Sequence, residues 1–521
     1  MKIVIGYPPL NSDKGIPLLS QNRQFQYFKK PTYIYPVVPA TAATLLKNAG
    51  YEVIWKDCIA EGWSLDTFYA FIKEQKPDII AFETKTPVVN EHWKIINELK
   101  RRTRDVLHKA LADARQSSVA GEGGVAIVLF GDHVTALPEE SFQHSQVDFV
   151  LTGGDYDFLL LNLCNALRDR GLSAIDHRLS TKLEPGIYYR EGDTIKNTGK
   201  FQLNHNLDTL PPIDRDLTNW KLYAYENGNY KRTPGTYIMS SRDCWWGKCT
   251  FCSWPTLYDT FRSRSVENVL DEVGILIEKY GVKEIMDDSG SFPIGEWLKD
   301  FCEGMIARGF NRKINFDANM RFGALSGAEY RLMKRAGFRL LLFGIESANQ
   351  KTLDRINKNV KVEQIIESCK LARQCGLYPH ITIMFGYPWE TYEDAQNTLK
   401  FGQWLLKKGY AYTMQATVVI PYPGSPLFKE CKTNSWLKTL DWQRYDMKEP
   451  VMNSPIPDEK IMRLVQSLYS IALNPEFIFN KLLSITSVED VAFFLRVAPR
   501  VFGHIFDFKH KSGKCAQCSG N

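Results

Sequence analysis

The 521-residue sequence contains no long apolar run and only a small excess of one charge. No segment approaches the roughly 18 consecutive apolar residues that a membrane-spanning helix requires. No leader peptide is visible, because Met1-Lys2 runs directly into a strand-like apolar segment. The net charge of +6, from 65 basic and 59 acidic residues, gives no independent support for a nucleic-acid partner. We therefore expect a cytoplasmic protein that does not bind nucleic acid.

The sequence also lacks a repeat of fixed period, and its composition is that of a globular protein, with 44% hydrophobic and 24% charged residues. Its length predicts two or three domains. Disulfides are not expected in the cytoplasm, so the eleven cysteines need another explanation. Six cysteines stand singly and are interpreted as small core hydrophobes: Cys58, Cys164, Cys302, Cys369, Cys375 and Cys431.

The first 170 residues alternate short apolar runs with helical patterns, which is typical of a buried parallel sheet. The predicted strands are Lys2–Gly6, Tyr51–Asp57, Asp78–Thr84, Val125–Gly131 and Asp148–Gly153. The predicted helices cover residues 38–49, 64–75, 90–115 and 157–168. We interpret residues 1–170 as a doubly wound, Rossmann-like α/β domain of five strands. Ligands of such domains bind beyond the carboxyl ends of the strands.

Residues 171–235 break this alternation and are interpreted as a linker with one hairpin. The hairpin is predicted over Gly186–Asn197, with Glu191-Gly192-Asp193 at its turn. The proline pair in Leu210-Pro211-Pro212-Ile213 follows in a polar stretch. The chain therefore crosses to a second domain here.

Six further strand–helix units follow in residues 236–430. The predicted strands are Thr236–Ser240, Glu284–Asp288, Ile314–Ala318, Leu340–Glu346, His380–Phe385 and Gln415–Pro421. The predicted helices cover residues 265–280, 295–308, 327–336, 350–356, 362–375 and 391–408. A closed barrel needs eight units, so we expect a partial (β/α)6 barrel. Residues 431–521 are predicted to form a C-terminal helical region, helical to about residue 508, and a tail.

Three cysteines lie within nine residues directly after the first barrel strand: Cys244, Cys249 and Cys252. Three thiolates can bind three irons of a [4Fe–4S] cluster and leave the fourth iron open. A structural zinc site would need a fourth ligand close by, and no histidine lies between Cys244 and residue 300. We predict an open cluster, with zinc as the alternative.

This segment resembles the cluster loop of the radical S-adenosylmethionine (SAM) superfamily. That family usually has Cys-x3-Cys-x2-Cys, whereas this chain has Cys-x4-Cys-x2-Cys. We expect Trp245, Trp246 and Gly247 to bulge outward and absorb the additional residue. The resemblance also implies that the backbone of Phe251 approaches the adenine of SAM.

The later strand ends carry further elements of the same family. Gly344-Ile345-Glu346-Ser347 resembles its "GIES" element and Gly386–Thr391 its "GxPxET" element. Pro421–Pro426 resembles the loop after the sixth strand. The SAM contacts that the resemblance implies are Phe251, Asp288, Asn319, Arg321, Glu346 and Gly386. Physically, carboxylates at these ends could bind an ammonium group, and Arg321 a carboxylate.

The resemblance implies that the open iron binds the amino and carboxylate groups of SAM. One electron, from a donor such as flavodoxin or ferredoxin, then cleaves the sulfonium. The resulting 5′-deoxyadenosyl radical abstracts hydrogen from a small-molecule or lipid-like substrate, and the protein excludes water and positions that hydrogen.

A doubly wound domain ahead of such a barrel resembles the cobalamin-binding subgroup of this superfamily. Gly131–Glu140 resembles its G-x-H-x-T-x-x-P-E-E segment, and Gly153-Gly154-Asp155 stands where the subgroup has Gly-Glu-Gly-Glu. The implied cobalamin contacts are Thr84, Gly131, His133, Thr135 and Gly153. The Asp-x-His-x-x-Gly motif of other cobalamin domains is missing. The alternative is a domain that has lost its ligand and only supports the barrel.

The C-terminal segments Phe477–Leu483 and Val491–Phe508 are rich in apolar residues. They are interpreted as a helical cap on the barrel, as an apolar wall for a hydrophobic substrate, or as a surface that touches a membrane. Cys515 and Cys518 could bind metal or relay electrons.

Both domains together predict a cobalamin-dependent radical SAM methyltransferase that acts on an unactivated carbon. The first alternative is a radical oxidative cyclisation or rearrangement without methyl transfer. The second alternative is a non-catalytic protein with zinc at the cysteine triplet.

Overall fold

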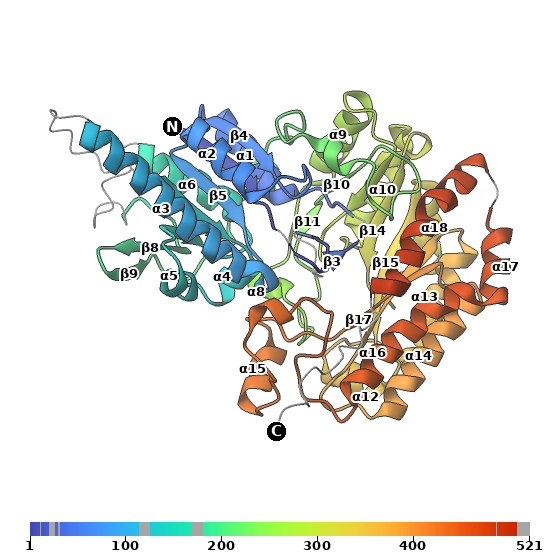
Figure 1. The fold of residues 1–521 in the computed structure, drawn as a ribbon. Helices are drawn as coiled ribbons and strands as arrows, with labels where there is room; N and C mark the ends of the chain where they lie inside the picture. The colour runs from blue at the N-terminus through green and yellow to red at the C-terminus, as the bar shows by residue number, and fades with distance from the viewer. Residues whose placement is uncertain are drawn as a thin grey trace, which may run out of the picture.

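The computed structural model describes residues 1–10, 12–19, 27–29, 32–113, 125–168, 181–485 and 487–507. Two large sheets organise these residues, one in the N-terminal third and one in the middle of the chain (Figure 1). The last three helices of the chain lie on the side of the second sheet. Within the described residues, no helix combines the length and the apolar character needed to cross a membrane.

The first sheet has the strand order β4-β1-β5-β6-β7-β8-β9. Its strands are β1 (Lys2–Tyr7), β4 (Glu52–Asp57), β5 (Ile79–Glu83), β6 (Ala126–Phe130), β7 (Phe149–Leu151), β8 (Ile187–Glu191) and β9 (Thr194–Asn197). Helices α1 (Val37–Asn48), α2 (Leu65–Gln75), α3 (Val89–Asp113) and α6 (Tyr156–Arg168) connect them, with the short α4 (Asp132–Ala136) and α5 (Glu140–His144). The residues of β5 and β6 are all buried, as expected for parallel strands covered on both faces.

This sheet has seven strands rather than the predicted five, because the hairpin β8–β9 belongs to it. β8 pairs antiparallel with β7, and the hydroxyl of Thr152 donates to the carbonyl of Gly186 where the two strands meet. The hairpin thus covers an edge that β7 would otherwise leave unpaired. The local pattern predicted the hairpin but not its pairing with a strand more than thirty residues earlier.

The second sheet has the order β10-β13-β14-β15-β16-β17, and all its neighbouring strands are parallel. Its strands are β10 (Gly235–Ile238), β13 (Glu284–Asp287), β14 (Asn315–Met320), β15 (Phe338–Glu346), β16 (Tyr378–Phe385) and β17 (Thr413–Val418). The helices between them are α9 (Val266–Glu278), α10 (Glu296–Ala307), α11 (Gly327–Arg335), α12 (Gln350–Arg355), α13 (Val362–Gln374) and α14 (Tyr392–Lys407). Because strand order follows chain order, the sheet curls in one direction into the predicted partial barrel.

The C-terminal region covers the open edge of this barrel and also reaches the first sheet. Its helices are α15 (Pro426–Thr433), α16 (Asp458–Tyr469), α17 (Pro475–Leu483) and α18 (Val488–Asp507), with the one-turn helix η5 (Trp442–Arg444). α16 packs on β17, where the Tyr469 hydroxyl hydrogen bonds to the backbone of Ala416. η5 packs against α3 and the one-turn helix η1 (Thr86–Val88) of the first domain. The predicted helical region is confirmed, and Cys515 and Cys518 lie outside the described residues.

The carboxyl ends of the two sheets meet. The short helix α8 (Trp254–Leu257), which follows the cysteine triplet, packs against α4 at the carboxyl edge of the first sheet. The backbone N–H of Gly154 donates to the carbonyl of Leu257 across this contact. The strand ends of both domains therefore surround one region of the molecule.

Candidate active site inside the partial barrel

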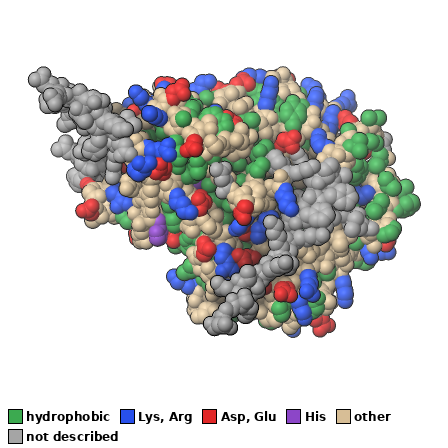
Figure 2. Space-filling view, in the orientation of Figure 1, with side chains coloured by type: hydrophobic (Ala, Val, Ile, Leu, Met, Phe, Trp, Pro, Cys, Tyr) green, Lys and Arg blue, Asp and Glu red, His purple; other side chains and the backbone are tan. Residues whose placement is uncertain are grey.

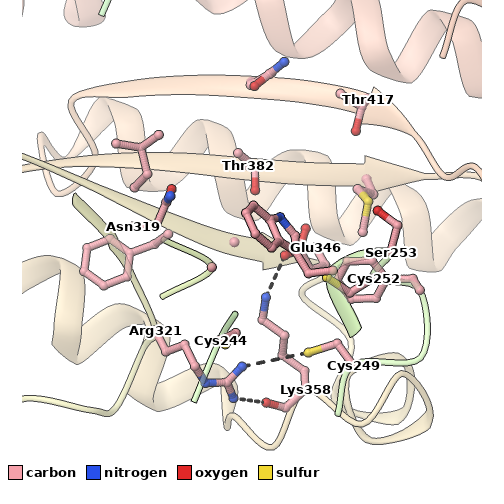
Figure 3. A pocket seen from close by; sticks show the side chains of 18 of the residues that line it. Cys244, Cys249, Cys252, Ser253, Asn319, Arg321, Glu346, Lys358, Thr382 and Thr417 are labelled. Carbon is pink, nitrogen blue, oxygen red and sulfur yellow. Dashed lines mark hydrogen bonds and ion pairs between the residues drawn. The ribbon is translucent and has the colours of Figure 1, made fainter. Parts of the chain in front are cut away.

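A cavity of about 200 Å³ lies inside the barrel at the carboxyl ends of its strands. One wall is the loop of residues 243–253, which runs from β11 (Ser241–Arg242) to α8 and is called the cluster loop below. The other walls are formed by inward-facing side chains of β14 to β17. Figure 3 shows side chains from the cluster loop and from these strands pointing into the same space.

All three cysteines of the triplet line this cavity and are partly accessible. The cluster loop can pass close to the end of β13 because Gly290 has no side chain. A Cβ at Gly290 would lie 2.6 Å from the backbone nitrogen of Cys244. Among the described residues, no group of three His, Cys, Asp or Glu side chains is arranged around a single ion. A cuboidal cluster does not need such a group, because each thiolate binds a different iron.

The additional residue of the cluster loop lies against Arg321, which follows β14. The guanidinium of Arg321 is 5.4 Å from the ring centre of Trp245 and 5.0 Å from that of Trp246. The indole N–H of Trp246 donates to the carbonyl of Asn357, at 2.8 Å. The two tryptophans therefore hold Arg321 by cation–π contacts and do not simply bulge into solvent.

Arg321 connects the triplet to the loop after α12. Its Nη1 points toward the Cys249 sulfur at 3.9 Å, and its Nη2 donates to the carbonyl of Lys358. Burial raises the pKa of the Cys249 thiol, and the charges of Lys358 and Arg321 oppose this effect. These two cations favour the thiolate, which is the form that binds iron.

Glu346 and Lys358 form a buried ion pair in the cavity wall, with 2.6 Å between Lys358 Nζ and Glu346 Oε1 (Figure 3). Glu346 ends β15 with a φ of +66°, which is rare for a residue with a side chain. A Cβ at Gly344 would lie 1.9 Å from Glu346 Oε1, so only glycine allows the carboxylate to fold back here. Such strained conformations concentrate at functional sites.

Four of the six predicted SAM contacts line the cavity: Phe251, Asn319, Arg321 and Glu346. Asp288 is buried outside the cavity wall, and the neighbouring Asp287 accepts hydrogen bonds from the backbone of Ser240 and Ser289. Gly386 also lies outside it, because a Cβ there would meet Ile461 of α16. Lys358 and Gly290 were missed, because neither belongs to the motif elements used for the prediction. Gly344 is part of the GIES element but was not itself predicted as a site residue.

Comparison with known proteins agrees with this geometry. Residues 238–402, which contain the cluster loop and strands β13 to β16, match the Radical SAM superfamily. Over these residues the chain matches a radical SAM domain. A similar protein of Pyrococcus horikoshii, described as an uncharacterized methyltransferase, is 27% identical over 85% of this chain and 89% of its own length.

Two further similar proteins extend the comparison. An anaerobic magnesium-protoporphyrin IX monomethyl ester cyclase of Cereibacter sphaeroides is 25% identical over 80% of the chain and 63% of its own length. The solved structure of the radical SAM methyltransferase TsrM from Kitasatospora setae, with cobalamin and a [4Fe–4S] cluster bound, has a TM-score of 0.65. The structural similarity covers 98% of this chain and 100% of TsrM at 14% sequence identity. The two proteins therefore share a similar fold in both domains.

The five predicted cobalamin contacts lie together at the carboxyl edge of the first sheet, but outside the cavity. Their polar groups are hydrogen bonded within the protein. Thr84 pairs with His92, and the Thr135 hydroxyl donates to Gly131 and accepts from the N–H of Gly153. These residues thus shape the sheet edge itself.

His133 is also fully engaged. Its ring nitrogens hydrogen bond to Thr86 at 3.2 Å and to Glu140 at 3.1 Å. Trp442 of η5 packs edge-on against the His133 ring and donates its indole N–H to Glu140. His133 therefore offers no free nitrogen to a cobalt ion, in agreement with the missing Asp-x-His-x-x-Gly motif.

Proposed function

We propose that this protein is a cobalamin-dependent radical SAM methyltransferase that acts on an unactivated carbon of a small or lipid-like molecule. The observation that carries the proposal is the convergence of the triplet, Arg321 and Glu346 on one cavity inside a partial barrel. The surrounding two-domain fold is similar to that of TsrM over nearly the whole chain.

Cys244, Cys249 and Cys252 would hold a [4Fe–4S] cluster with one open iron. When bound, the reduced cluster supplies the electron that cleaves the sulfonium of SAM to a 5′-deoxyadenosyl radical. Arg321 would stabilise the thiolate of Cys249 through its N–H. The contacts of Arg321 with Trp245 and Trp246 would keep that N–H in place.

Glu346, Lys358 and Arg321 would orient SAM against the open iron. SAM carries an ammonium, a carboxylate and two ribose hydroxyls, and these three side chains offer charges of both signs. Glu346 can accept from the ammonium or a hydroxyl, while Lys358 and Arg321 can bind the carboxylate. Asn319 donates its amide to the carbonyl of Ser289 and so presents its oxygen to the cavity.

Cobalamin is the second cofactor of the proposal and would donate the methyl group. Its support is the meeting of the two carboxyl edges, together with the likeness to TsrM, whose structure contains cobalamin. Since both nitrogens of His133 are engaged, cobalamin would bind here without cobalt ligation by His133. Thr84, Gly131, His133, Thr135 and Gly153 remain the proposed contacts of cobalamin at the edge of the first sheet.

The similarity to the Cereibacter cyclase favours one alternative, a radical cyclisation without methyl transfer. Both reactions release 5′-deoxyadenosine, but only methyl transfer from SAM releases S-adenosylhomocysteine as well. The zinc alternative has no support among the described residues, since no single-ion ligand group is present there.

The test is anaerobic purification followed by reconstitution with iron, sulfide and cobalamin. We expect absorbance of cluster and cobalamin together, and 5′-deoxyadenosine after reduction with dithionite. A protein that contains zinc, no iron and forms no 5′-deoxyadenosine would refute the proposal. The triple variant Cys244→Ala, Cys249→Ala, Cys252→Ala is the control for cluster-dependent cleavage.

The proposal includes a cytoplasmic location and a flavodoxin or ferredoxin as electron donor. It also includes contact of α17 and α18 with a membrane surface. α17 has no buried residue, and apolar side chains gather over α17 at the right-hand end of the molecule in Figure 2.

A further inference from the structure

The part of the cavity wall that β16 and β17 form is lined by uncharged side chains and is called the uncharged half below. Inward-facing residues of parallel barrel strands lie side by side in layers. Thr382 of β16 is in register with Gln415 of β17, and Met384 with Thr417. Two residues earlier on β16, His380 is in register with Leu342 of β15. All six side chains line the cavity.

Charged residues of the cavity wall lie on other elements. Asp243 and Lys248 belong to the cluster loop, Arg321 and Lys358 contact it, and Glu346 at the end of β15 is paired with Lys358. Asn229 also lines the cavity, and its carbonyl accepts from the guanidinium of Arg339. Arg339 is itself paired with two fully buried carboxylates, Glu284 and Asp317. Its charge is therefore already balanced within the protein.

The hydroxyl of Thr417 has no hydrogen-bond partner among the described residues. Thr417 is 1% exposed and lines the cavity. Figure 3 shows Thr382 and Thr417 on neighbouring strands beside the space occupied by Glu346. A buried hydroxyl without a partner costs about 1–3 kcal/mol, which a ligand with a donor or acceptor would recover.

His380 adds a second neutral group to the same wall. Its Nδ1 is hydrogen bonded to the hydroxyl of Thr413, at 2.9 Å. Burial lowers the pKa of His380 to about 4, so the ring is uncharged at neutral pH. The ring then has one further nitrogen with which to hydrogen bond a neutral ligand.

We propose that this uncharged half of the cavity binds a neutral polar group of the substrate, such as an amide, ketone or hydroxyl, and rejects carboxylates and phosphates. Thr417, Gln415, Thr382 and His380 would form the hydrogen-bonding wall. An anion bound to β16 and β17 would lose its hydration without a cation on these strands, because the cations of the cavity wall lie in the cluster loop or contact it. This inference rests on the proposed function, since it assigns the charged residues of the cavity to SAM.

The test compares phenylacetamide with phenylacetate, two probes of similar shape that differ in charge. Binding to the anaerobically reconstituted protein with SAM is measured by ligand-observed NMR. We expect the amide to bind at least about tenfold more tightly than the carboxylate, a factor that corresponds to 1.4 kcal/mol. Equal binding of both probes, tighter binding of the carboxylate, or no binding of the amide would overturn the inference.

The variant Thr417→Val tests the wall itself. Removal of the hydroxyl should weaken amide binding about threefold to tenfold, the usual range for one neutral hydrogen bond. The melting temperature should not fall, because the hydroxyl has no partner to lose. The matched control is Thr194→Val on β9, far from the cavity. Unchanged amide binding in Thr417→Val, or weakened SAM binding with unchanged amide binding, would assign the hydroxyl another role and refute the inference.

These outcomes are separate from those of the proposed function. If 5′-deoxyadenosine forms but the amide is not preferred, the radical reaction stands and the neutral substrate class is wrong. If no 5′-deoxyadenosine forms while the amide is still preferred, the proposed function is wrong and the cavity remains a binding site for neutral polar molecules.

Discussion

Arg321 joins three parts of the site through one side chain. It contacts the two tryptophans of the lengthened cluster loop, approaches the Cys249 sulfur, and donates to the backbone of Lys358. A cation this close to a thiolate stabilises the more negative, reduced form of a bound cluster. The additional residue in the triplet spacing thus gives this chain a way to hold a charge beside its cluster.

We predict that Arg321→Met makes the reduction potential of the cluster more negative, by on the order of 50 mV, from the loss of one charged hydrogen bond. The potential is measured by electron paramagnetic resonance during a redox titration without SAM. Arg321→Lys, which keeps the charge, should shift the potential less. A potential that is the same in Arg321→Met and in the unchanged protein would contradict this role.

At the scale of elements, the cluster loop is fixed at several points along its length. Thr250 donates its backbone N–H to Ile356, Trp246 donates to Asn357, and the carbonyl of Thr250 accepts from Leu427 of α15. The loop after β13 completes this support, since Gly290 touches the backbone of Asp243 and Cys244. The position of the triplet therefore depends on loops that follow three different strands.

Gly290→Ala should disturb this arrangement without changing any thiol. The new Cβ would lie 2.6 Å from the backbone nitrogen of Cys244, and backbone atoms cannot move aside as a flexible side chain does. We predict that the iron content after reconstitution falls by more than half. The control is Gly327→Ala in α11, where the nearest atom would be 3.5 Å away. Equal iron content in both variants would show that the close approach is not required.

The helices α17 and α18 expose one apolar face each. Phe479 and Leu482 on α17 are 60% and 59% exposed, and Val488 and Leu495 on α18 are still more exposed. We predict that the protein binds anionic phospholipid vesicles, and that Phe479→Glu with Leu482→Glu weakens this binding about tenfold or more, since each large apolar side chain contributes about 1.5–3 kcal/mol when buried.

Co-sedimentation with the vesicles measures this effect. Leu440→Glu is the matched control, because Leu440 is 56% exposed but lies in the segment between α15 and η5. If the control and the α17 variant bind equally, or if the unchanged protein does not bind, the exposed face has no part in membrane contact.

The sequence predicted the strands and helices closely because their signals are local. The predicted ranges of β16 and α14 differ from the observed ones by no more than two residues. The site was predicted less completely, because the wall of a barrel depends on which residue of a strand end faces inward. Asp288 and Gly386, which the resemblance implies as SAM contacts, are not among the residues that line the cavity, and that prediction stays a prediction. Lys358 enters the wall from a loop twelve residues after its partner Glu346.

At the scale of the whole molecule, a buried charge network joins the two domains. Arg242, two residues before Cys244, pairs with Asp155 at 2.7 Å and with Asp157 at 2.5 Å. Arg262 and His205 also contact Asp155. The sequence identified Gly153-Gly154-Asp155 only as a loose match to a cofactor motif. Its pairing with a residue almost ninety positions later could not be read from local pattern.

We predict that Arg242→Met lowers the free energy of unfolding by about 3–5 kcal/mol, because it leaves the buried Asp157 carboxylate without its cation. Urea unfolding measures this loss. Arg308→Met is the matched control, since Arg308 pairs with the exposed Glu267 and Asp271, and it should cost about 1 kcal/mol or less. A similar cost for both variants would show that the network contributes little.

His205 makes this junction sensitive to pH. Burial lowers the pKa of His205, but hydrogen bonds to Asp155 and Glu184 outweigh it and raise the pKa to about 9. A histidine in the unfolded chain titrates near 6.5, so the charged ring contributes its full share to the free energy of unfolding below that pH. This contribution is lost as the pH rises from about 6.5 to 9.

We therefore predict that the melting temperature of the protein falls over this pH range, as measured by scanning calorimetry. His205→Gln should be less stable at pH 6 and should lose less stability between pH 6.5 and 9. An identical pH profile for the variant would mean that His205 does not titrate as its two carboxylate partners require.

The ion pairs of Arg242 with Asp155 and Asp157 have a consequence for how such a protein can change over evolutionary time. They fix one end of the cluster loop to the N-terminal domain, so that domain supports the iron site even if it binds no ligand of its own. A descendant that lost its second cofactor could not discard the N-terminal half of the gene without first replacing Arg242.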